Sequence, residues 1–145
     1  MMSQTMMSRE VYVNCRFYVK IGNKEQGVFT EVSGLQAETN IEEYQEGGHN
    51  GFTHQLPGRT TISRITLKRG MVASNDLFAW YLKIMRGEIE RRNVSIEMYD
   101  STGSKVMHWE FAEAFPMKWV GPQFTADGQT AAVETLELAH AGLIP

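Results

Sequence analysis

Apolar and polar residues alternate through the first part of the chain with a period of two, the spacing of a β-strand with one buried face. Within residues 11–21 the odd-numbered positions are apolar, and the even-numbered ones carry polar or tyrosine side chains. This pattern predicts a half-buried strand. Residues 22–24, Gly-Asn-Lys, have the composition of a tight turn and are expected to end that strand.

A second extended segment is predicted over residues 28–44, with an interruption at Gly34. Beyond this glycine the period of two places Glu38, Asn40 and Glu42 on one face of the strand. The opposite face carries Ala37, Thr39, Ile41 and Glu43. Because polar side chains are so frequent here, we expect the strand to be exposed to water on at least one side.

Residues 46–58 are predicted to form one long loop, because glycine and proline are concentrated there. Loops of this length inside compact domains usually have a function or are disordered. The residues that define it are Glu46, Gly47, Gly48, His49, Asn50, Gly51, Leu56, Pro57 and Gly58. Residues 59–68 are expected to be extended again, so that two long strands flank the loop.

One helix is predicted, over residues 74–86. Ser74 is a suitable N-cap, Asp76 suits the first turn, and Gly87 stands where a C-cap glycine belongs. Apolar side chains cover much of its circumference. Such a helix is expected to be widely buried, against its own sheet and against a neighbouring chain.

The remaining segments predict a mainly β domain. Residues 94–99 and 105–111 form a hairpin about the turn at 100–103, and residues 131–139 form a last strand. Residues 115–124 contain two prolines and a glycine and are expected to be irregular. The six or seven strands show no βαβ alternation, so we expect an antiparallel β-sandwich or barrel segment with one packed helix. Residues 1–145 form a single domain in this interpretation, and residues 1–8 form a flexible N-terminus.

Composition and charge narrow the range of functions. The net charge of −3 does not favour nucleic acid, and the single cysteine excludes an intrachain disulfide. No apolar run approaches the ~20 residues that span a membrane, and the first eight residues lack the pattern of a signal peptide. We therefore expect a protein assembled in the cytoplasm whose free subunit does not insert into membranes.

The search for catalytic chemistry finds no convincing site. His49 and His54 have no cysteine or carboxylate at ligand spacing, so loop polarity is preferred to metal binding. His140, at a strand end, is expected to make a structural hydrogen bond. Cys15 is expected to be a small core residue. No phosphate loop, nucleophile elbow or dinucleotide fingerprint is present. We predict a protein that is not an enzyme and that binds neither a cofactor nor a metal.

The polar strand still requires an explanation. A strand face too polar for a core suits an aqueous interior, which a barrel closed by several subunits would provide without free sheet edges.

An ordered set of short motifs resembles the tail tube proteins of contractile-tailed phages and of phage-tail-like contractile injection systems. The motifs extend over residues 9–143, and only Ala141 stands where many members carry a glutamate. They are FYV at 17–19, FTEVSGL at 29–35, YQEGG at 44–48, LPG at 56–58, ITLKRG at 65–70, RRN at 91–93, AFP at 114–116 and ETLELAH at 134–140.

This resemblance implies hexameric rings that stack into a hollow tube inside a contractile sheath, with the helix outside and a shared β-barrel around the lumen. It implies that the loop at 46–58 contacts the adjacent ring and that Glu38, Asn40 and Glu42 face the lumen. Cargo or DNA would pass through the bore when the sheath drives the tube through an envelope. The implied partners are further copies of the chain, the sheath, the baseplate and the tube terminator, in a particle that is released or membrane-anchored.

Three alternatives remain open beside the main tube subunit. The first is a paralogue at the tube's end, next to the baseplate or the terminator. The second is a secreted ring protein of the type VI kind, which carries effectors. The third is an unrelated β-barrel for a small ligand, which would need an apolar interior.

Overall fold

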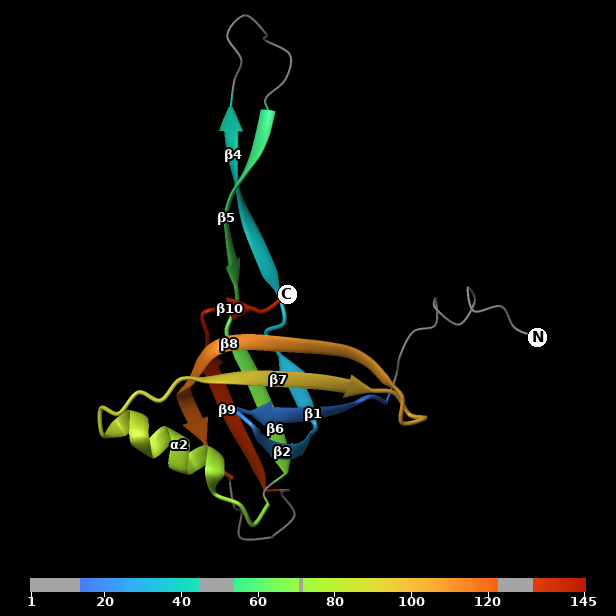
Figure 1. Cartoon of the computed structure of the whole chain (residues 1–145), viewed down its shortest axis with the longest axis vertical. Helices are drawn as coiled ribbons and strands as arrows, with labels where there is room; N and C mark the ends of the chain where they lie inside the picture. Colours follow the sequence, from blue (N-terminus) through green and yellow to red (C-terminus); the bar gives the residue numbers. More distant parts are fainter. Residues whose placement is uncertain (1–13, 45–53, 71, 123–131) are drawn as a thin grey trace, which may run out of the picture.

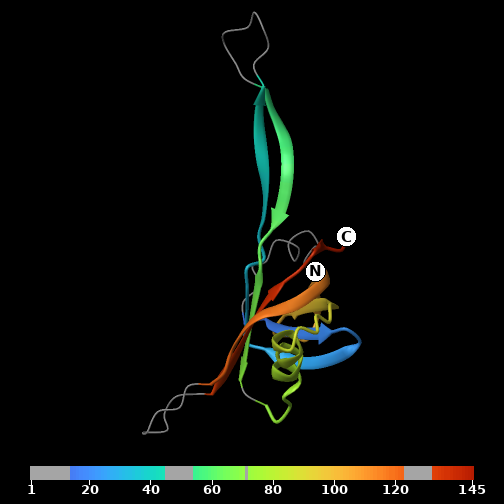
Figure 2. The same cartoon turned by 90° about the vertical axis from the view of Figure 1, so that its left-hand side faces the viewer.

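Two layers of antiparallel strands form the body of the protein, and a narrow two-stranded arm projects from it (Figures 1 and 2). The computed structural model describes residues 14–44, 54–70, 72–122 and 132–145. The strands of the body are β1 (Arg16–Ile21), β2 (Lys24–Phe29), β3 (Glu31–Ser33), β6 (Ile65–Gly70), β7 (Arg92–Tyr99), β8 (Lys105–Val120), β9 (Val133–Ala139) and β10 (Gly142–Leu143). The strands of the arm are β4 (Ala37–Tyr44) and β5 (His54–Ile62).

The sheet of the body curls until its two ends meet. Its strand order is β2-β1-β7-β8-β9-β6-β3, with β10 paired to β8. The first and last strands of this order are consecutive in the chain, and between them the backbone N–H of Thr30 donates to the carbonyl of Lys68 on β6 at 2.9 Å. The predicted antiparallel sandwich or barrel with one packed helix is therefore confirmed.

Strand β8 belongs to both layers, and the prediction of an irregular segment at 115–124 was wrong for residues 115–120. Residues 121 and 122 have no regular secondary structure, and residues 123 and 124 lie outside the described structure. The strand continues through Pro116 as far as Val120. Proline has no N–H to donate, but β-bulges tolerate it, and the pairing of β8 with β9 shifts between Pro116 and Lys118. Glu113, with φ of 49°, marks a second irregularity near the middle of the strand. The two kinks allow one long strand to serve both layers.

Helix α2 (Asp76–Met85) packs on β8. The ring centroids of Phe78 on the helix and Trp119 on the strand lie 4.5 Å apart. The helix starts one residue later than predicted, with Asn75 as N-cap, and the Ser74 hydroxyl accepts from the N–H of Asp76 at 3.3 Å. Its end is as predicted. Gly87 has φ of +83°, and the N–H groups of residues 87 and 88 donate to the carbonyls of residues 84 and 83 at 3.0 and 2.8 Å.

The core lies between the layers and under one face of the helix. From α2 it takes Leu77 and Trp80, whereas Met85 at the helix end is 68% exposed in the single subunit. The burial of this helix against a neighbouring chain stays a prediction. Val19 and Ile21 are buried, as the alternation of residues 11–21 predicts, although residues 11–13 lie outside the described structure. Cys15 is half-buried just before β1, and the prediction that it belongs to the core was wrong.

The arm corrects the predicted extent of the loop. Leu56, Pro57 and Gly58 lie in β5, paired with β4, whereas residues 46–51 lie outside the described structure. Pro57 pairs with Ile41 where the register of the two strands shifts. Each strand of a two-stranded sheet has an open edge, so a proline at such an irregularity need not remove a ladder hydrogen bond. The glycine and proline at residues 56–58 therefore predicted a loop where the structure has a paired strand.

The root of the arm is tightly built where the chain leaves and re-enters the body. Gly34 has φ of +88°, and a Cβ there would overlap the carbonyl oxygen of Arg64. The N–H of Ser63 donates to the carbonyl of Gln36 at 3.1 Å, and His140 Nε2 donates to the carbonyl of Ser63 at 2.8 Å. The predicted structural hydrogen bond of His140 is thus confirmed.

Gly34→Ala is expected to lower the free energy of unfolding by at least about 2 kcal/mol, because it adds a backbone clash to an unfavourable φ. Gly103→Ala is the matched control: Gly103 has φ of +89°, but nothing lies within 4 Å of its added Cβ. The control should lose only about 1 kcal/mol. Urea unfolding of both variants measures the difference, and equal losses would contradict the close approach at Gly34.

Candidate assembly surface

The arm has two faces of different chemistry, fixed by the pairing of β4 with β5. One face, called here the Ile41 face, carries Ala37, Thr39, Ile41 and Glu43, opposite Ile62, Thr60, Pro57 and Gln55. The hydroxyls of Thr39 and Thr60 lie 2.8 Å apart and bond to each other across it. The other face, called here the Glu42 face, carries Glu38, Asn40 and Glu42, with Leu56 and Thr61.

The three residues predicted to face a lumen therefore share one face of the arm. A Cβ on Gly58 would lie 3.5 Å from Cγ of Glu42 and 3.6 Å from Cβ of Asn40, which places Gly58 beneath these side chains. From residue 37 to residue 43 every side chain of β4 is exposed. At the root the Ile41 face meets the body through Ile62, which packs against the core. Beyond the root, the two faces of β4 differ in chemistry and not in exposure.

An apolar groove of about 180 Å³ lies at the root of the arm. Body residues line one side of it, and the first residue pair of the arm, Ala37 and Ile62, lines the other. We call it the root groove, and it is lined by Leu35, Gln36, Ala37, Ile62, Trp109, Phe111 and Leu143. Leu35 and Leu143 are 37% and 45% exposed, so this groove places neighbouring apolar side chains at the surface of the subunit.

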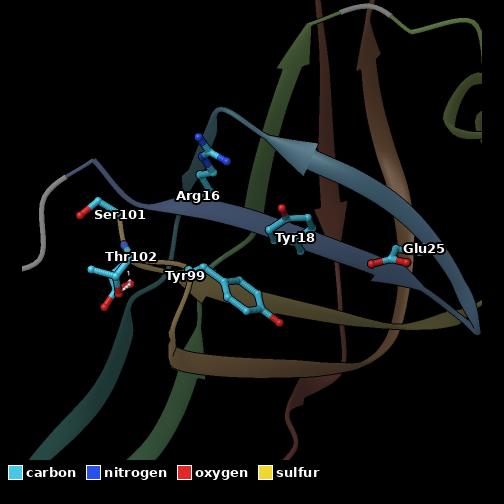
Figure 3. A pocket seen from close by; sticks show the side chains of 8 residues that line it. Arg16, Tyr18, Glu25, Tyr99, Ser101 and Thr102 are labelled. Atoms are coloured by element: carbon cyan, nitrogen blue, oxygen red, sulfur yellow. Dashed lines mark hydrogen bonds between the residues drawn. The ribbon is translucent and has the colours of Figure 1, made fainter.

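A larger cleft of about 460 Å³ lies at the C-terminal end of β7, where Arg16, Tyr18, Tyr99 and the turn at 100–103 meet (Figure 3). The rings of Tyr18 and Tyr99 contact edge to face, with centroids 5.0 Å apart. The carboxylate of Asp100 accepts from the N–H groups of Thr102 and Ser104 at 3.0 and 2.9 Å, so it is committed to the turn. The Thr102 hydroxyl also donates to Asp100 Oδ1 at 2.6 Å, so the polar groups of the cleft are bonded to one another within the turn.

Carboxylates with lowered pKa values predict how stability responds to acid. The hydroxyl of Tyr99 donates to Glu97 at 2.9 Å, and this bond, with Lys105, lowers the pKa of Glu97 below its ordinary value of 4.5. A lowered pKa in the folded state stabilises the fold above the unfolded pKa, and this contribution is lost as the pH falls through the folded pKa. The pKa values of Asp76, Glu90 and Asp100 are lowered as well.

We therefore expect the free energy of unfolding to be nearly level above about pH 5.5 and to fall steadily below about pH 4.5. Glu97→Gln should reduce the slope of this fall, because the amide does not titrate in that range. Urea unfolding at a series of pH values measures both slopes. An unchanged slope in the variant would contradict the assignment.

A buried ion pair inside the body was missed by sequence reasoning. Arg69 on β6 and Glu134 on β9 are 1% and 2% exposed, and Arg69 Nε lies 3.2 Å from Glu134 Oε2. Trp119 Nε1 donates to Glu134 Oε1 at 2.8 Å, and Arg69 Nη1 donates to the carbonyl of Gln26 at 2.8 Å. A signal was available: the period of two puts Arg69 with Ile65 and Leu67, and Glu134 with Leu136 and Leu138, on apolar faces.

The histidines do not converge on a metal site within the described structure. His54 lies in β5, and His49 falls outside the described residues. His108 is exposed on β8 opposite Glu97. Among described residues no group of three or more histidine, cysteine or acidic side chains could hold an ion. Over the same residues, no helix has the length and hydropathy to cross a membrane.

Comparison with known proteins gives a consistent result. The model of the T4-like virus tail tube protein gp19 family matches residues 13–144. A chain in the structure of the extracellular contractile injection system PVC, described as its sheath-tube complex in the extended state, is 27% identical with a TM-score of 0.80. That match covers 99% of this chain and 97% of the other.

Two further structures extend this pattern. A chain of the PVC sheath/tube terminator in the extended state is 28% identical with a TM-score of 0.78, and the match covers 93% and 95% of the two chains. Hcp1 from Flavobacterium johnsoniae shares the fold alone, at 17% identity and a TM-score of 0.53 over 89% of this chain and 98% of Hcp1. None of the curated protein sequences is significantly similar.

Proposed function

Because the chain belongs to the T4-like virus tail tube protein family, we propose that its copies close into hexameric rings and that these rings stack into a hollow tube within a contractile sheath. The protein is a structural subunit of a tail tube. Its relatives are structural tube proteins, and we extend this to the proposal that the chain has no catalytic activity and needs no cofactor.

The projecting arm is the observation that carries the stacking proposal. It forms a two-stranded sheet separate from the body, and Ile41 on β4 is 61% exposed while Leu56 on β5 is 49% exposed. Isolated two-stranded hairpins are marginally stable in water, because they bury little on either face. A second molecule that covers the arm would bury these apolar side chains and so stabilise the two-stranded sheet.

In the proposed tube the arm joins one ring to the next. Leu56, Pro57 and Gly58 on β5 would contact the adjacent ring. The same contact is proposed for residues outside the described structure, namely Glu46, Gly47, Gly48, His49, Asn50 and Gly51. The Glu42 face would be turned to the aqueous lumen, where Glu38, Asn40 and Glu42 keep their carboxylates and amide hydrated. Cargo or DNA would pass along this surface, and the sheath, baseplate and tube terminator would be the other partners.

The tube-end alternative has no better support than the main tube subunit. Identities to the sheath-tube and sheath/tube terminator structures are 27% and 28%, and the TM-scores are 0.80 and 0.78. The likeness to type VI ring proteins concerns the fold alone. A small-ligand barrel is disfavoured, because large core side chains such as Trp80 and Phe111 fill the interior of the body.

The test is to locate the protein in the particle and to count it. Particles purified from cells that express the whole gene set would be imaged by cryo-electron microscopy, and the ratio of this protein to the sheath protein measured by quantitative mass spectrometry. We expect the protein along the full length of the inner tube, in a copy number that rises in proportion to that of the sheath protein. A single ring's worth of copies at one end would establish the tube-end role instead, and absence from the particle would overturn the proposal.

A further inference from the structure

We infer that the body opens and closes like a clamshell: its two layers separate about strand β8, and the side chain of Arg69 is the clasp that holds them together. The inference concerns the single subunit and goes beyond the proposed function. The hinge is the strand that the layers share (Figure 1). Strand β8 pairs with β7 up to Ala114 and with β9 from Phe115 onward. The φ of 49° at Glu113 and the register shift after Pro116 lie at this change of partner, where a bulged strand bends.

The two layers meet again on the side opposite β8, at a place that we call the seam, between β2 and Arg69 near the end of β6. The chain crosses from one layer to the other at Thr30, and β3 then pairs with β6 over residues 31–33. Within the described structure no cross-strand pair joins β2 to β6, whereas β1 with β7 and β6 with β9 form six pairs each. Because so few backbone bonds cross the seam, opening it disrupts less structure than separating the strands of one layer.

Arg69 crosses the seam with its side chain. Its Nη1 donates to the carbonyl of Gln26 on β2 at 2.8 Å, and its guanidinium carbon lies 5.2 Å from the centre of the Phe29 ring, also on β2. The Nε of the same side chain lies 3.2 Å from Glu134 in its own layer. Arg69 and Phe29 are each 1% exposed, and a hydrogen bond is electrostatically stronger in such surroundings than in water. One planar group therefore holds both layers.

Strand β2 presents an acceptor for this clasp. Its pairing with β1 shifts beside Gly27, so that Gln26 is the extra residue of a β-bulge and has no partner on β1. The Gln26 carbonyl is thereby released from the ladder and accepts from Arg69 instead. Gly27 has φ of +88°, which glycine adopts without strain. The bulge on one layer and the guanidinium on the other are thus complementary.

Hydrogen exchange of the full-length chain, resolved to single amides, tests the clamshell. The amide of Thr30 reports on the seam, because it donates to the carbonyl of Lys68 at 2.9 Å. The amides of Ile96 and Leu136 report on global unfolding, because their strands are paired on both sides. In the wild-type protein Thr30 is expected to exchange at least about tenfold faster than these two. Equal rates for all three amides would mean that the layers separate only in global unfolding, and would overturn the inference.

Arg69→Lys tests the clasp itself. The variant keeps a positive charge beside Glu134, but an ammonium lacks the planar fork that bonds Glu134 and Gln26 together. Loss of a hydrogen bond from a charged group is expected to speed the exchange of Thr30 about tenfold or more. An unchanged rate at Thr30 would show that this amide frays independently of Arg69, and the clasp would be refuted.

Two control variants separate the clasp from general destabilisation. Lys24→Gln removes an exposed ion pair between β2 and Asp76, and it should change the exchange of Thr30 less than about twofold. Gly103→Ala strains a turn that stays intact when the seam opens, so it should speed Ile96 and Leu136 and leave Thr30 unchanged. An effect of either control on Thr30 as large as that of Arg69→Lys would contradict the inference.

A second variant keeps the test decisive if Arg69→Lys does not fold. Arg69→Met with Glu134→Leu removes the guanidinium without leaving an unpaired buried charge. Thr30 is again expected to exchange about tenfold faster than in the wild-type protein, because the Gln26 carbonyl has lost its donor across the seam. A folded double variant with the wild-type rate at Thr30 would overturn the inference.

Discussion

A variant in which an Asn-Gly turn replaces residues 40–59 is expected to fold normally and to form no tubes. Thr39 and Thr60 are a cross-strand pair with bonded hydroxyls, so a two-residue turn can join them without moving the root. The arm belongs to a sheet of its own, and the core residues all lie in the body. Its removal should therefore change the unfolding midpoint by only a few degrees while it deletes the proposed contact between rings.

Circular dichroism, thermal unfolding and electron microscopy measure these outcomes together. The control is a variant that keeps β4 and β5 but carries Glu38→Gln on the Glu42 face, which should assemble normally. Full-length tubes from the shortened protein would contradict the role of the arm. An unfolded product would show that the arm is part of the folding unit, a separate result from a folded protein that does not assemble.

Glu134→Leu is expected to lower the free energy of unfolding by about 3–5 kcal/mol, because it leaves the Arg69 guanidinium charged and buried without its carboxylate. The same change removes the acceptor of the Trp119 indole N–H. Arg69 Nη2 already has no hydrogen-bond partner in the described structure. The guanidinium therefore has no other nearby acceptor to replace the carboxylate of Glu134. The loss should be visible as a large shift of the urea midpoint with an unchanged slope.

The double variant Arg69→Met with Glu134→Leu separates two free energies: the destabilisation caused by an unpaired buried charge, and the net contribution of the ion pair to stability. Replacing a whole buried ion pair with apolar residues of similar size is often neutral or stabilising. We therefore expect the double variant to recover most of the loss seen in Glu134→Leu. A double variant as unstable as the single one would show that the loss comes from the missing pair or from the orphaned indole N–H of Trp119, and not from the unpaired guanidinium.

The sequence predicted the segments in which local pattern and tertiary structure agree. The alternation at residues 17–21, the turn at 100–103 and Gly87 at the helix end all depend on near neighbours, and all three are present. Pro116 and Pro57 misled the prediction, because both lie at register shifts where a strand tolerates proline. Whether a strand is paired, shifted or open at that point depends on its partner, which the local sequence does not contain.

The candidate site was predictable to a lesser extent. The alternation of β4 was sufficient to group Glu38, Asn40 and Glu42 on one face. The root groove could not be predicted, because it brings together Leu35, Trp109 and Leu143 from three distant parts of the chain. The buried pair of Arg69 and Glu134 was overlooked because charged residues in strands are usually exposed, and only the facing strand identifies the exception.

The stiff root gives the arm the properties of a lever. Gly34 packs against the carbonyl of Arg64. The N–H of Ser63 donates to the carbonyl of Gln36, and the carbonyl of Ser63 accepts from His140. These contacts hold the direction in which the arm leaves the body. Over an arm of roughly 25 Å, a tilt of about 5° at the root displaces the far end by about 2 Å. If the arm makes the proposed contact between rings, its direction would contribute to the rotation from one ring to the next. Small changes at the root would then alter the helical twist of the tube while leaving each ring intact.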